Sequence, residues 1–410
     1  MQSFNNLLLL VLLACLSVVA YAQQNNQDII FISTVVEFKN FAYRVNKGEK
    51  FESKKVVLTK DLFLNDTTGW RHWQVEAIGK SQWIPIGTWK YPFRGYFDGG
   101  GHTIYGLYIN RETNGFFQGL FGCIDGSIIE NLHLKMSVIK GCQYVGGIVG
   151  MVADNISNGN DSTIIRNCSN MGTVIGSRNY VGGIAGVIYD PLAGIFNCKN
   201  KGSIQGKNRI GGIVGYCCVN HVHNCCNQGP IYGLTLVGGI SGVFFMNEKN
   251  KIVTTVINCY NTGDIHARLY GAGIAGQLDF CDTRLLKNYV PILSLSNCYN
   301  AGRVECNYIA SEDNLIGVYR KGNNDIYPLS MISKACSINY SLKDEIHLLM
   351  NKYTLNYSSS PMNVVKVTAE EMRSSAFVEC LNHFVRENLG YCKKWFVDSL
   401  NVNRGFPVFD

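Results

Sequence analysis

The sequence has little charge and little proline for its length, and it lacks long runs of basic residues. Of its 410 residues, 16% are charged, 8 are proline and 43 are glycine. No Lys/Arg run is long enough to predict a nucleic-acid-binding tail, although the net charge is +7. Glycine follows no strict Gly-X-Y period, which excludes a collagen-like chain, and 46% hydrophobic residues exclude a disordered one. The 16 cysteines are less than half the density of a disulfide scaffold.

A long apolar run occurs only at the N-terminus. Residues 7–22 are apolar apart from Ser17, and they end in Ala20-Tyr21-Ala22, a small-x-small pattern that precedes signal-peptidase cleavage. We therefore expect residues 1–22 to be a secretory signal peptide and the mature chain to have no integral membrane span. Because the n-region lacks Lys and Arg, lipidation at Cys15 and an uncleaved anchor stay open as alternatives. The predicted location is secreted or at the cell surface, with the periplasm as the alternative.

One pattern recurs through the middle of the chain. It reads Asn-Cys-x-Asn-x-Gly-x-(Val/Ile), then a variable stretch, then Val-Gly-Gly-Ile-x-Gly. A half-copy at 131–150 precedes the first full copy. The cysteines of the pattern are separated by 30, 27, 34 and 39 residues; they are Cys168, Cys198, Cys225, Cys259 and Cys298.

The repeat predicts an all-β fold, a right-handed parallel β-helix. Each copy has apolar runs of four to six residues, which are too short for helices and cannot bury their own apolar face. Stacking the units gives a solenoid with a continuous core. Rungs about 4.8 Å apart place like residues on like, so we expect a cysteine ladder and a hydrogen-bonded ladder of Asn170, Asn200, Asn227, Asn261 and Asn300. We expect the glycine pairs where rungs approach closely or where φ is positive.

Both flanks contain candidate caps for the ends of the solenoid. Thr34-Val35-Val36-Glu37 is a capping box, and Thr368-Ala369-Glu370-Glu371 is a second one. We expect the second helix to carry one apolar face, made by Met372, Ala376, Cys380 and Phe384. The predicted organisation is a signal peptide at 1–22, an N-terminal cap with one helix and short strands at 23–97, the repeat β-helix at 98–340, and a C-terminal cap with one helix at 341–410.

The repeats resemble the GLUG-motif repeats of secreted and surface bacterial proteins of the Bacteroidetes type, including those attached to immunoglobulin A peptidases. The residues that carry the resemblance are Gly119-Leu120-Phe121-Gly122, the Gly-Gly-Ile-x-Gly copies, the segments 83–87 and 93–107, and the ending at Trp395, Asp398 and 403–407. The resemblance implies a β-helical architecture. The peptidase members carry a His-Glu-x-x-His zinc helix, and this sequence has no such string. Peptidase activity is therefore not implied.

Carboxylates are too sparse in the repeats to predict a catalytic site. β-Helices that cut polysaccharides need several carboxylates on one face. Between Met151 and Gly242 the acidic residues are Asp154, Asp161 and Asp190, on different rungs. We therefore predict no enzyme activity, and no catalytic, cofactor-binding or metal-binding residue.

The stretch Cys217 to Cys226 is the densest in reactive side chains, with four cysteines and two histidines. It fits a zinc site, a local disulfide or plain packing. We favour packing, because Cys225 is a ladder cysteine and Val222 takes the inward place of Ile165 and Ile195. His223 is then expected to be outward and unconstrained. Fifteen cysteines remain after signal removal, so at least one is unpaired, paired between chains or buried.

Two further groups of residues have both a structural and a functional reading. Asp98 and His102 look like a catalytic pair, but they lie in a Gly-rich turn, which favours a structural role. The aromatic residues near Trp83 fit either the packed core of a cap, which we favour, or a platform for sugar stacking; they are Trp70, Trp73, Trp83, Trp89, Tyr91, Phe93, Tyr96 and Phe97.

The sequence favours an exported, non-catalytic repeat protein for adhesion or for binding a glycan or a surface protein. The regular face of a solenoid suits extended polymers, and we expect this face, rather than a pocket, to make the contact. The positive charge favours acidic glycans, and no nucleic-acid partner is expected. A polysaccharide-degrading β-helix enzyme and a structural component of the cell envelope are the alternatives.

Overall fold

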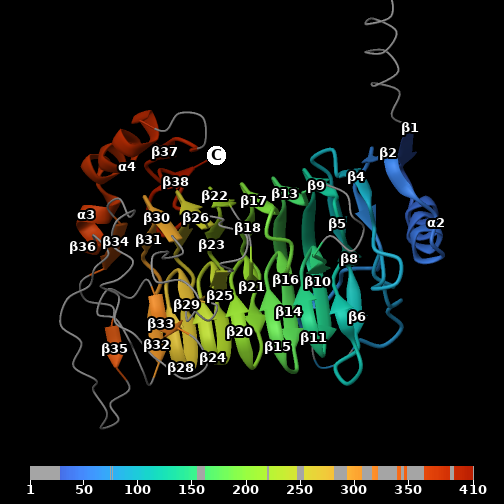
Figure 1. The fold of residues 1–410 in the computed structure, drawn as a ribbon, viewed down its shortest axis with the longest axis horizontal. Helices are drawn as coiled ribbons and strands as arrows, with labels where there is room; N and C mark the ends of the chain where they lie inside the picture. Colours follow the sequence, from blue (N-terminus) through green and yellow to red (C-terminus); the bar gives the residue numbers. More distant parts are fainter. Residues whose placement is uncertain are drawn as a thin grey trace, which may run out of the picture.

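The protein folds into an elongated, right-handed parallel β-helix with helices at both ends (Figure 1). The computed structural model describes residues 28–409 apart from 74, 76, 155–161, 219–220, 247–253, 281–292, 307–315, 322–338, 343–345, 349–363 and 388–391. The predicted signal peptide at 1–22 lies outside the described residues. No helix in the described part of the chain is both long and apolar enough to cross a membrane.

Three parallel sheets form the sides of the solenoid. Sheet A contains β1 (Asp28–Ile32), β2 (Phe51–Leu58), β4 (Gly95–Asp98), β9 (Ile128–Glu130), β13 (Ile164–Arg166), β17 (Gly194–Phe196), β22 (His221–His223), β26 (Thr254–Ile257) and β30 (Leu293–Ser296). Sheet C contains β8 (Phe121–Ile124), β12 (Val149–Val152), β16 (Ala185–Ile188), β21 (Val214–Cys217), β25 (Ser241–Met246), β29 (Ala275–Phe280) and β33 (Ile316–Lys321).

Sheet B is the widest side, because most rungs contribute two or three strands to it. Its strands are β3 (Leu62–Phe63), β5 (Thr103–Tyr105), β6 (Tyr108–Asn110), β7 (Phe116–Gln118), β10 (His133–Gly141), β11 (Gln143–Gly146), β14 (Ser169–Gly176), β15 (Asn179–Gly182), β18 (Lys199–Asn200), β19 (Ile204–Gln205), β20 (Asn208–Gly211), β23 (Cys226–Asn227), β24 (Ile231–Gly238), β27 (Tyr260–Asn261), β28 (Ile265–Ala272), β31 (Tyr299–Asn300), β32 (Val304–Cys306), β34 (Asn339–Leu342), β35 (Ile346–Leu348) and β36 (Val364–Val367).

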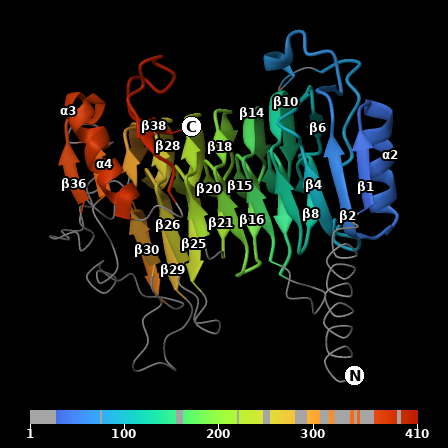
Figure 2. The same cartoon turned by 90° about the horizontal axis from the view of Figure 1, so that it is seen from above.

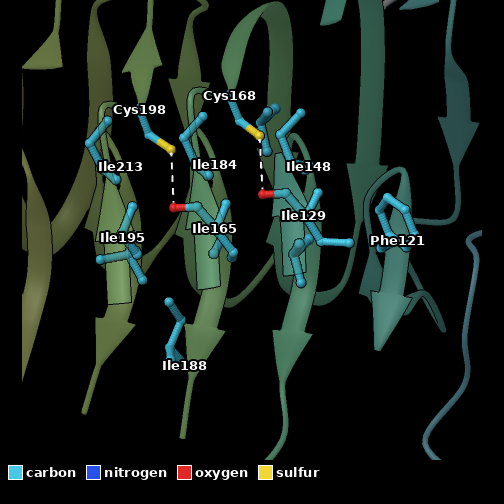
Figure 3. Close-up of a cluster of buried hydrophobic side chains, with 14 of the residues drawn as sticks. Phe121, Ile129, Ile148, Ile165, Cys168, Ile184, Ile188, Ile195, Cys198 and Ile213 are labelled. Carbon is cyan, nitrogen blue, oxygen red and sulfur yellow. Dashed lines mark hydrogen bonds between the residues drawn. The ribbon is translucent and has the colours of Figure 1, made fainter. Parts of the chain in front are cut away.

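The register between rungs places like residues on like, as the repeat predicts. Ile165 pairs with Ile195, Ile195 with Val222, and Val222 with Val256, and all four side chains are buried. The five ladder cysteines are also buried. Figure 3 shows Cys168 and Cys198 in this core, with each thiol directed at a backbone carbonyl of the preceding rung, Ile129 O at 3.8 Å and Ile165 O at 3.7 Å. All cysteines that the structure describes are thiols.

Two asparagine ladders run along the solenoid, of which the sequence predicted one. In the predicted ladder, Nδ2 of each side chain donates to Oδ1 on the next rung at 2.8–2.9 Å, from Asn170 through to Asn300. The second ladder consists of the asparagines that precede the five ladder cysteines, together with Asn131, which precedes Leu132, and it turns the chain from sheet A to sheet B. These residues have φ between 53° and 58°, a left-handed conformation that asparagine tolerates; they are Asn131, Asn167, Asn197, Asn224, Asn258 and Asn297.

Close approach, rather than positive φ, explains the glycine pairs of the repeat. None of the Val-Gly-Gly glycines has positive φ. A Cβ on Gly183 would lie 2.3 Å from the carbonyl oxygen of Gly212, and a Cβ on Gly212 would lie 2.0 Å from that of Gly239. Side chains are therefore excluded here by the backbone of the next rung.

The N-terminal helix covers the first rung, as predicted. Helix α2 (Val35–Asn46) begins with a complete capping box between Thr34 and Glu37. It buries Phe38 and Phe41 against aromatic residues of the first rungs, and Figure 2 shows it at that end of the solenoid. Because β1 and β2 already belong to sheet A, the expected boundary at 97/98 does not coincide with an edge of this sheet.

The described part of the C-terminal segment contains two helices rather than the one expected, and the predicted apolar face is wrong. Helix α3 (Ala369–Arg373) has the expected capping box at Thr368, but the chain becomes extended at Ser374 and restarts as α4 (Ser375–Glu387). The break changes the helical phase, so Ala376 and Cys380 are exposed and Phe384 is half-buried, while Met372 is buried. The buried residues of α4 are Phe377, Val378, Leu381, Asn382 and Val385.

The C-terminal hairpin packs on the flank of the solenoid. Its strands β37 (Trp395–Phe396) and β38 (Val408–Phe409) form an antiparallel pair. Trp395 is 1% exposed, and its Nε1 donates to Oδ1 of Asn258 at 2.6 Å. The indole lies 5.6 Å from the ring of Tyr260 and 5.5 Å from that of Tyr299. The hairpin therefore covers the outer side of the later rungs.

Candidate functional site

A groove of about 920 Å³ follows the corner between sheets A and B. It crosses five successive turns of the solenoid, from the turn at 98–101 to the turn at 224–226. The residues that line it are Asp98, Gly100, Gly101, Asn131, His133, Lys135, Asn167, Cys168, Ser169, Met171, Asn197, Cys198, Lys199, Lys201, Asn224, Cys226, Lys393 and Phe409. We call this feature the lateral groove.

The C-terminal hairpin closes one end of the lateral groove. The backbone N–H of Lys393 donates to Oδ1 of Asn224 at 2.9 Å, and Nδ2 of Asn258 donates to the carbonyl oxygen of Lys393 at 3.0 Å. Phe409, at the end of β38, lines the groove beside this contact. The groove is thus the part of the flank that the hairpin leaves open.

The second asparagine ladder forms the floor of the lateral groove. Nδ2 of Asn167 donates to Oδ1 of Asn131, and Nδ2 of Asn197 donates to Oδ1 of Asn167, both at 2.9 Å. The Oδ1 atom of Asn197 is buried and accepts no hydrogen bond from any residue that the structure describes. The ladder is interrupted where Asn224 binds the backbone of Lys393. Each amide on the floor is therefore held in a fixed orientation by its neighbours.

Four lysine side chains give the lateral groove its charge; they are Lys135, Lys199, Lys201 and Lys393. All four are half-buried, and none forms an ion pair with an acidic residue in the described part of the chain. Burial, together with the charge of Lys199, lowers the pKa of Lys201. Lys199 and Lys201 therefore repel each other, while Asp398 attracts Lys201 and Asp61 attracts Lys135 from beyond ion-pair distance.

Asp98 is the one carboxylate among the lining residues that the structure describes, and its negative charge is compensated by three neighbouring donors. Its carboxylate accepts from Asn131 Nδ2 at 3.0 Å and from the backbone N–H of Gly100 at 2.9 Å, and Lys55 Nζ lies at 2.9 Å. Burial opposes ionisation, but these three donors outweigh it and lower the pKa of Asp98. The arrangement can bind an anion, and it offers no second carboxylate for paired acid–base chemistry.

Asp98 and His102 do not form a pair with each other. His102 Nδ1 lies 3.3 Å from Oδ1 of Asp61, whereas Asp98 is engaged by Lys55, Gly100 and Asn131. Asp61 also accepts from the backbone N–H of Thr103. The carboxylates of Asp98 and Asp61 both accept backbone hydrogen bonds in turns. This agrees with the structural role predicted for the Gly-rich turn.

The Cys217–Cys226 stretch does not converge on a metal. Cys225 points into the core, whereas Cys226 lies under the C-terminal hairpin beside Tyr260. In the described part of the chain no group of three or more His, Cys, Asp or Glu side chains is placed to hold a metal ion. His223 lies on the outer face of its strand, as predicted, but the prediction that it is unconstrained is wrong, because the side chain is 5% exposed. Its Nε2 lies 2.7 Å from Oγ1 of Thr255, and its ring packs edge-on against Phe196.

The predicted aromatic cluster does not form one platform. Trp83, Phe93 and Phe97 are buried in the core of the N-terminal rungs, as the favoured interpretation expected, whereas Trp73 is buried in a separate cluster with Tyr108 and Val138. Trp89 is 56% exposed and begins a separate stack that continues through Phe117, Tyr144 and Tyr180 at centroid distances of 6.2, 5.1 and 5.0 Å. Phe117 and Tyr144 each have a stacked ring on both sides, so they present edges rather than the faces that sugar stacking needs, and Trp89 is the exposed end of the stack.

Two of the three acidic residues between Met151 and Gly242, Asp154 and Asp190, lie in the described part of the chain, and burial together with the charge of Asp154 raises the pKa of Asp190. Asp190 is 3% exposed, and its carboxylate accepts from the backbone N–H groups of Thr163 and Leu192. Asp154 is exposed, and Asp161 lies outside the described residues. The carboxylate of Asp190 therefore stabilises a turn by accepting backbone hydrogen bonds.

The sequence analysis missed the lateral groove and all four of its lysines. A signal was available for two of them, because Lys199 and Lys201 flank Asn200 of the predicted inward ladder. Alternation along a strand places both neighbours of an inward residue on the outer face. Lys393 comes from a segment 192 residues after Lys201 (393 − 201 = 192), and nothing in the repeat pattern indicates that contact.

The comparisons with known proteins support the fold. The chain is similar to the crystal structure of a Bacteroides ovatus protein described as a "putative immunoglobulin A1 protease", with a TM-score of 0.55 and 20% sequence identity. The similarity covers 94% of this chain and 93% of that chain. At this identity the shared property is the fold. No protein-family model matches the sequence, and no curated protein matches it.

Proposed function

We propose that the protein is an exported, non-catalytic repeat protein of the GLUG-motif kind that binds an extended glycan or protein chain in the lateral groove. The observation that carries this proposal is the open groove across five turns of the solenoid, with a floor of oriented amides. A groove of this length and regularity suits a polymer rather than a compact metabolite. A location outside the cell follows from the N-terminal pattern at 7–22 and is part of the proposal.

The geometry gives less support to an enzyme. One neutralised carboxylate lines the described groove, whereas glycoside hydrolysis uses a pair. The activity named in the description of the Bacteroides ovatus protein is not proposed for this chain, because the sequence has no His-Glu-x-x-His string.

Binding to a panel of immobilised polysaccharides and extracellular proteins tests the proposal. Met171 lies half-buried on the groove floor, and Met171→Trp should fill the groove and abolish binding of the polymer that the wild-type protein retains. Ile175→Trp is the matched control, because Ile175 is a half-buried residue of the same strand, β14, outside the groove. Binding that survives Met171→Trp, or that both variants lose equally, contradicts the groove as the site.

Protease treatment of intact source cells tests the location, with a periplasmic protein as the control. Loss of this chain while the control survives supports surface exposure. Protection in intact cells together with cleavage after lysis contradicts adhesion and favours a role inside the envelope.

A further inference from the structure

We propose that the ligand of the lateral groove is an acidic polysaccharide, a glycan chain that bears repeated carboxylate or sulfate groups. This inference rests on the proposed function and specifies the chemistry of the ligand. It is carried by four half-buried lysines that form no ion pair with an acidic residue in the described part of the chain.

Two of the four lysines lie along one row of the groove, and a third lies in the neighbouring row. In the register of sheet B, His133 aligns with Ser169 and Ser169 with Lys199. Lys135 aligns with Met171, and Lys201 follows the aligned pair Asn170 and Asn200. Lys135 and Lys201 therefore lie two rungs apart, a separation of about 10 Å for parallel strands. A chain that carries negative groups at intervals can meet both ends of the row.

Two acidic residues beside the groove are already engaged by donors within the protein. Asp98 is held by Lys55, Gly100 and Asn131. Glu130, on the neighbouring strand β9, accepts from the side chains of Arg166 and Tyr96. Asp398 and Asp61 offset part of the charge of Lys201 and Lys135, but neither forms an ion pair with a groove lysine. An anionic ligand would relieve the repulsion between Lys199 and Lys201.

The floor favours a glycan over an acidic peptide. An extended peptide gains most of its affinity by adding to an exposed sheet edge. The strands under the groove have parallel neighbours on both sides: β14, for example, pairs with β10 and with β18. No backbone edge is open there. What the floor offers instead is a line of amide, hydroxyl and imidazole groups, which suits a chain rich in hydroxyl groups.

The floor also favours a glycan over a single-stranded nucleic acid. Proteins that bind single strands combine positive charge with aromatic rings on which the bases stack. Phe409 is the only Phe, Tyr or Trp among the described residues that line the groove. Lysine charge without such rings matches carboxylate or sulfate groups on a sugar backbone.

Binding of the full-length mature chain to defined polymers tests the inference. The probes are polygalacturonate, its methyl-esterified form, neutral amylose, poly-glutamate and a single-stranded polynucleotide. We expect polygalacturonate to bind, with an affinity that falls as NaCl is raised, and the esterified and neutral chains to bind at least tenfold more weakly.

Lys199→Gln with Lys201→Gln should weaken polygalacturonate binding by about tenfold, because two charge contacts are lost. The control is Lys39→Gln with Lys47→Gln, which removes the same net charge from the exposed side of α2 and should leave the Kd unchanged. Circular dichroism and thermal unfolding of both variants establish that each is folded.

The outcomes separate this inference from the proposed function. If a neutral polymer binds as tightly as polygalacturonate and Met171→Trp blocks it, the groove binds polymers but the acidic ligand is wrong. Preference for poly-glutamate or for the polynucleotide likewise overturns the glycan assignment. If the two double variants bind alike, the lysines do not recognise the ligand. If no polymer depends on Met171, the proposed function fails as well.

Discussion

The side-chain amide of Asn227 donates a hydrogen bond to Oδ1 of Asn261, 2.8 Å away on the next rung. The same Nδ2 donates to the carbonyl oxygen of Gly229 at 2.8 Å, and Oδ1 of Asn227 accepts from Asn200 at 2.8 Å. Asn227 is fully buried. One side chain thus links three rungs and satisfies polar groups that no water reaches.

Asn227→Ala should therefore destabilise the protein strongly. The substitution leaves a donor on Asn200 and an acceptor on Asn261 buried without a partner, and we expect a loss of about 3 kcal/mol in the free energy of unfolding. Urea unfolding measures the change. Asn114→Ala is the control, because Asn114 is exposed in a turn, and it should change stability by less than about 0.5 kcal/mol. Equal effects of the two substitutions would show that the ladder bonds add nothing to stability.

A second prediction separates close approach from backbone conformation as the reason for glycine. In Gly212→Ala the new Cβ would lie 2.0 Å from the carbonyl oxygen of Gly239, so the rungs must move apart. In Gly69→Ala the Cβ meets nothing within 4 Å, but φ is +64°. We expect Gly69→Ala to cost about 1–2 kcal/mol and Gly212→Ala to cost more than about 3 kcal/mol or to prevent folding. Thermal unfolding ranks the two, and the reverse order would contradict the steric argument.

Burial of His223 predicts that stability falls in mild acid. Desolvation lowers the pKa of His223 to about 4 in the folded state, with a further contribution from His221. An unfolded histidine has a pKa near 6.5. Between about pH 6.5 and pH 4 the histidine is therefore protonated in the unfolded chain but remains neutral in the folded chain. Stability is thus complete above about pH 6.5 and is lost as the pH falls toward 4, by about 2 kcal/mol at pH 5.

His223→Leu should remove this part of the pH dependence. Urea unfolding at pH 7.5 and pH 5 gives the change in stability for each protein, and the wild-type chain should lose about 2 kcal/mol more than the variant. Comparing the two proteins cancels the contribution of His133, whose pKa burial also lowers. His221 is present in both proteins, and its pKa is lowered by its own burial. Parallel pH profiles for wild type and variant would refute the assignment.

The sequence predicts the parts of this fold that repeat and misses the parts that depend on single long-range contacts. The cysteine ladder, the Asn170 ladder and the N-terminal helix follow from spacing and capping patterns, because stacking aligns every copy in the same way. The left-handed asparagine ladder was also encoded in the Asn-Cys dipeptide, since asparagine tolerates positive φ, but that signal was not used.

Other features could not be read from a local pattern. The break at Ser374 replaces a regular helix by two short ones, and no proline or glycine marks it. The contact between Lys393 and Asn224 joins positions 169 residues apart and closes the lateral groove. His223 occupies an outer position of its strand, and its burial depends on packing beyond the repeat. Each of these is a tertiary contact that occurs once, so no periodic signal records it.

Release of the C-terminal hairpin should uncover Cys226. This thiol is 1% exposed and packs in the apolar cluster that contains Trp395 and Tyr260. Trp395→Ala removes the indole and its hydrogen bond to Asn258, at a cost of about 3–5 kcal/mol. Because the hairpin lies on the outside of the rungs, we expect it to detach while the solenoid stays folded.

Alkylation followed by peptide mass spectrometry should then find Cys226 modified rapidly in the Trp395→Ala variant and slowly in the wild type. Cys198, which points into the core one rung away, serves as the internal control and should stay protected in both. Modification of both cysteines would mean that the rungs themselves open, and protection of both would mean that Trp395 does not anchor the hairpin.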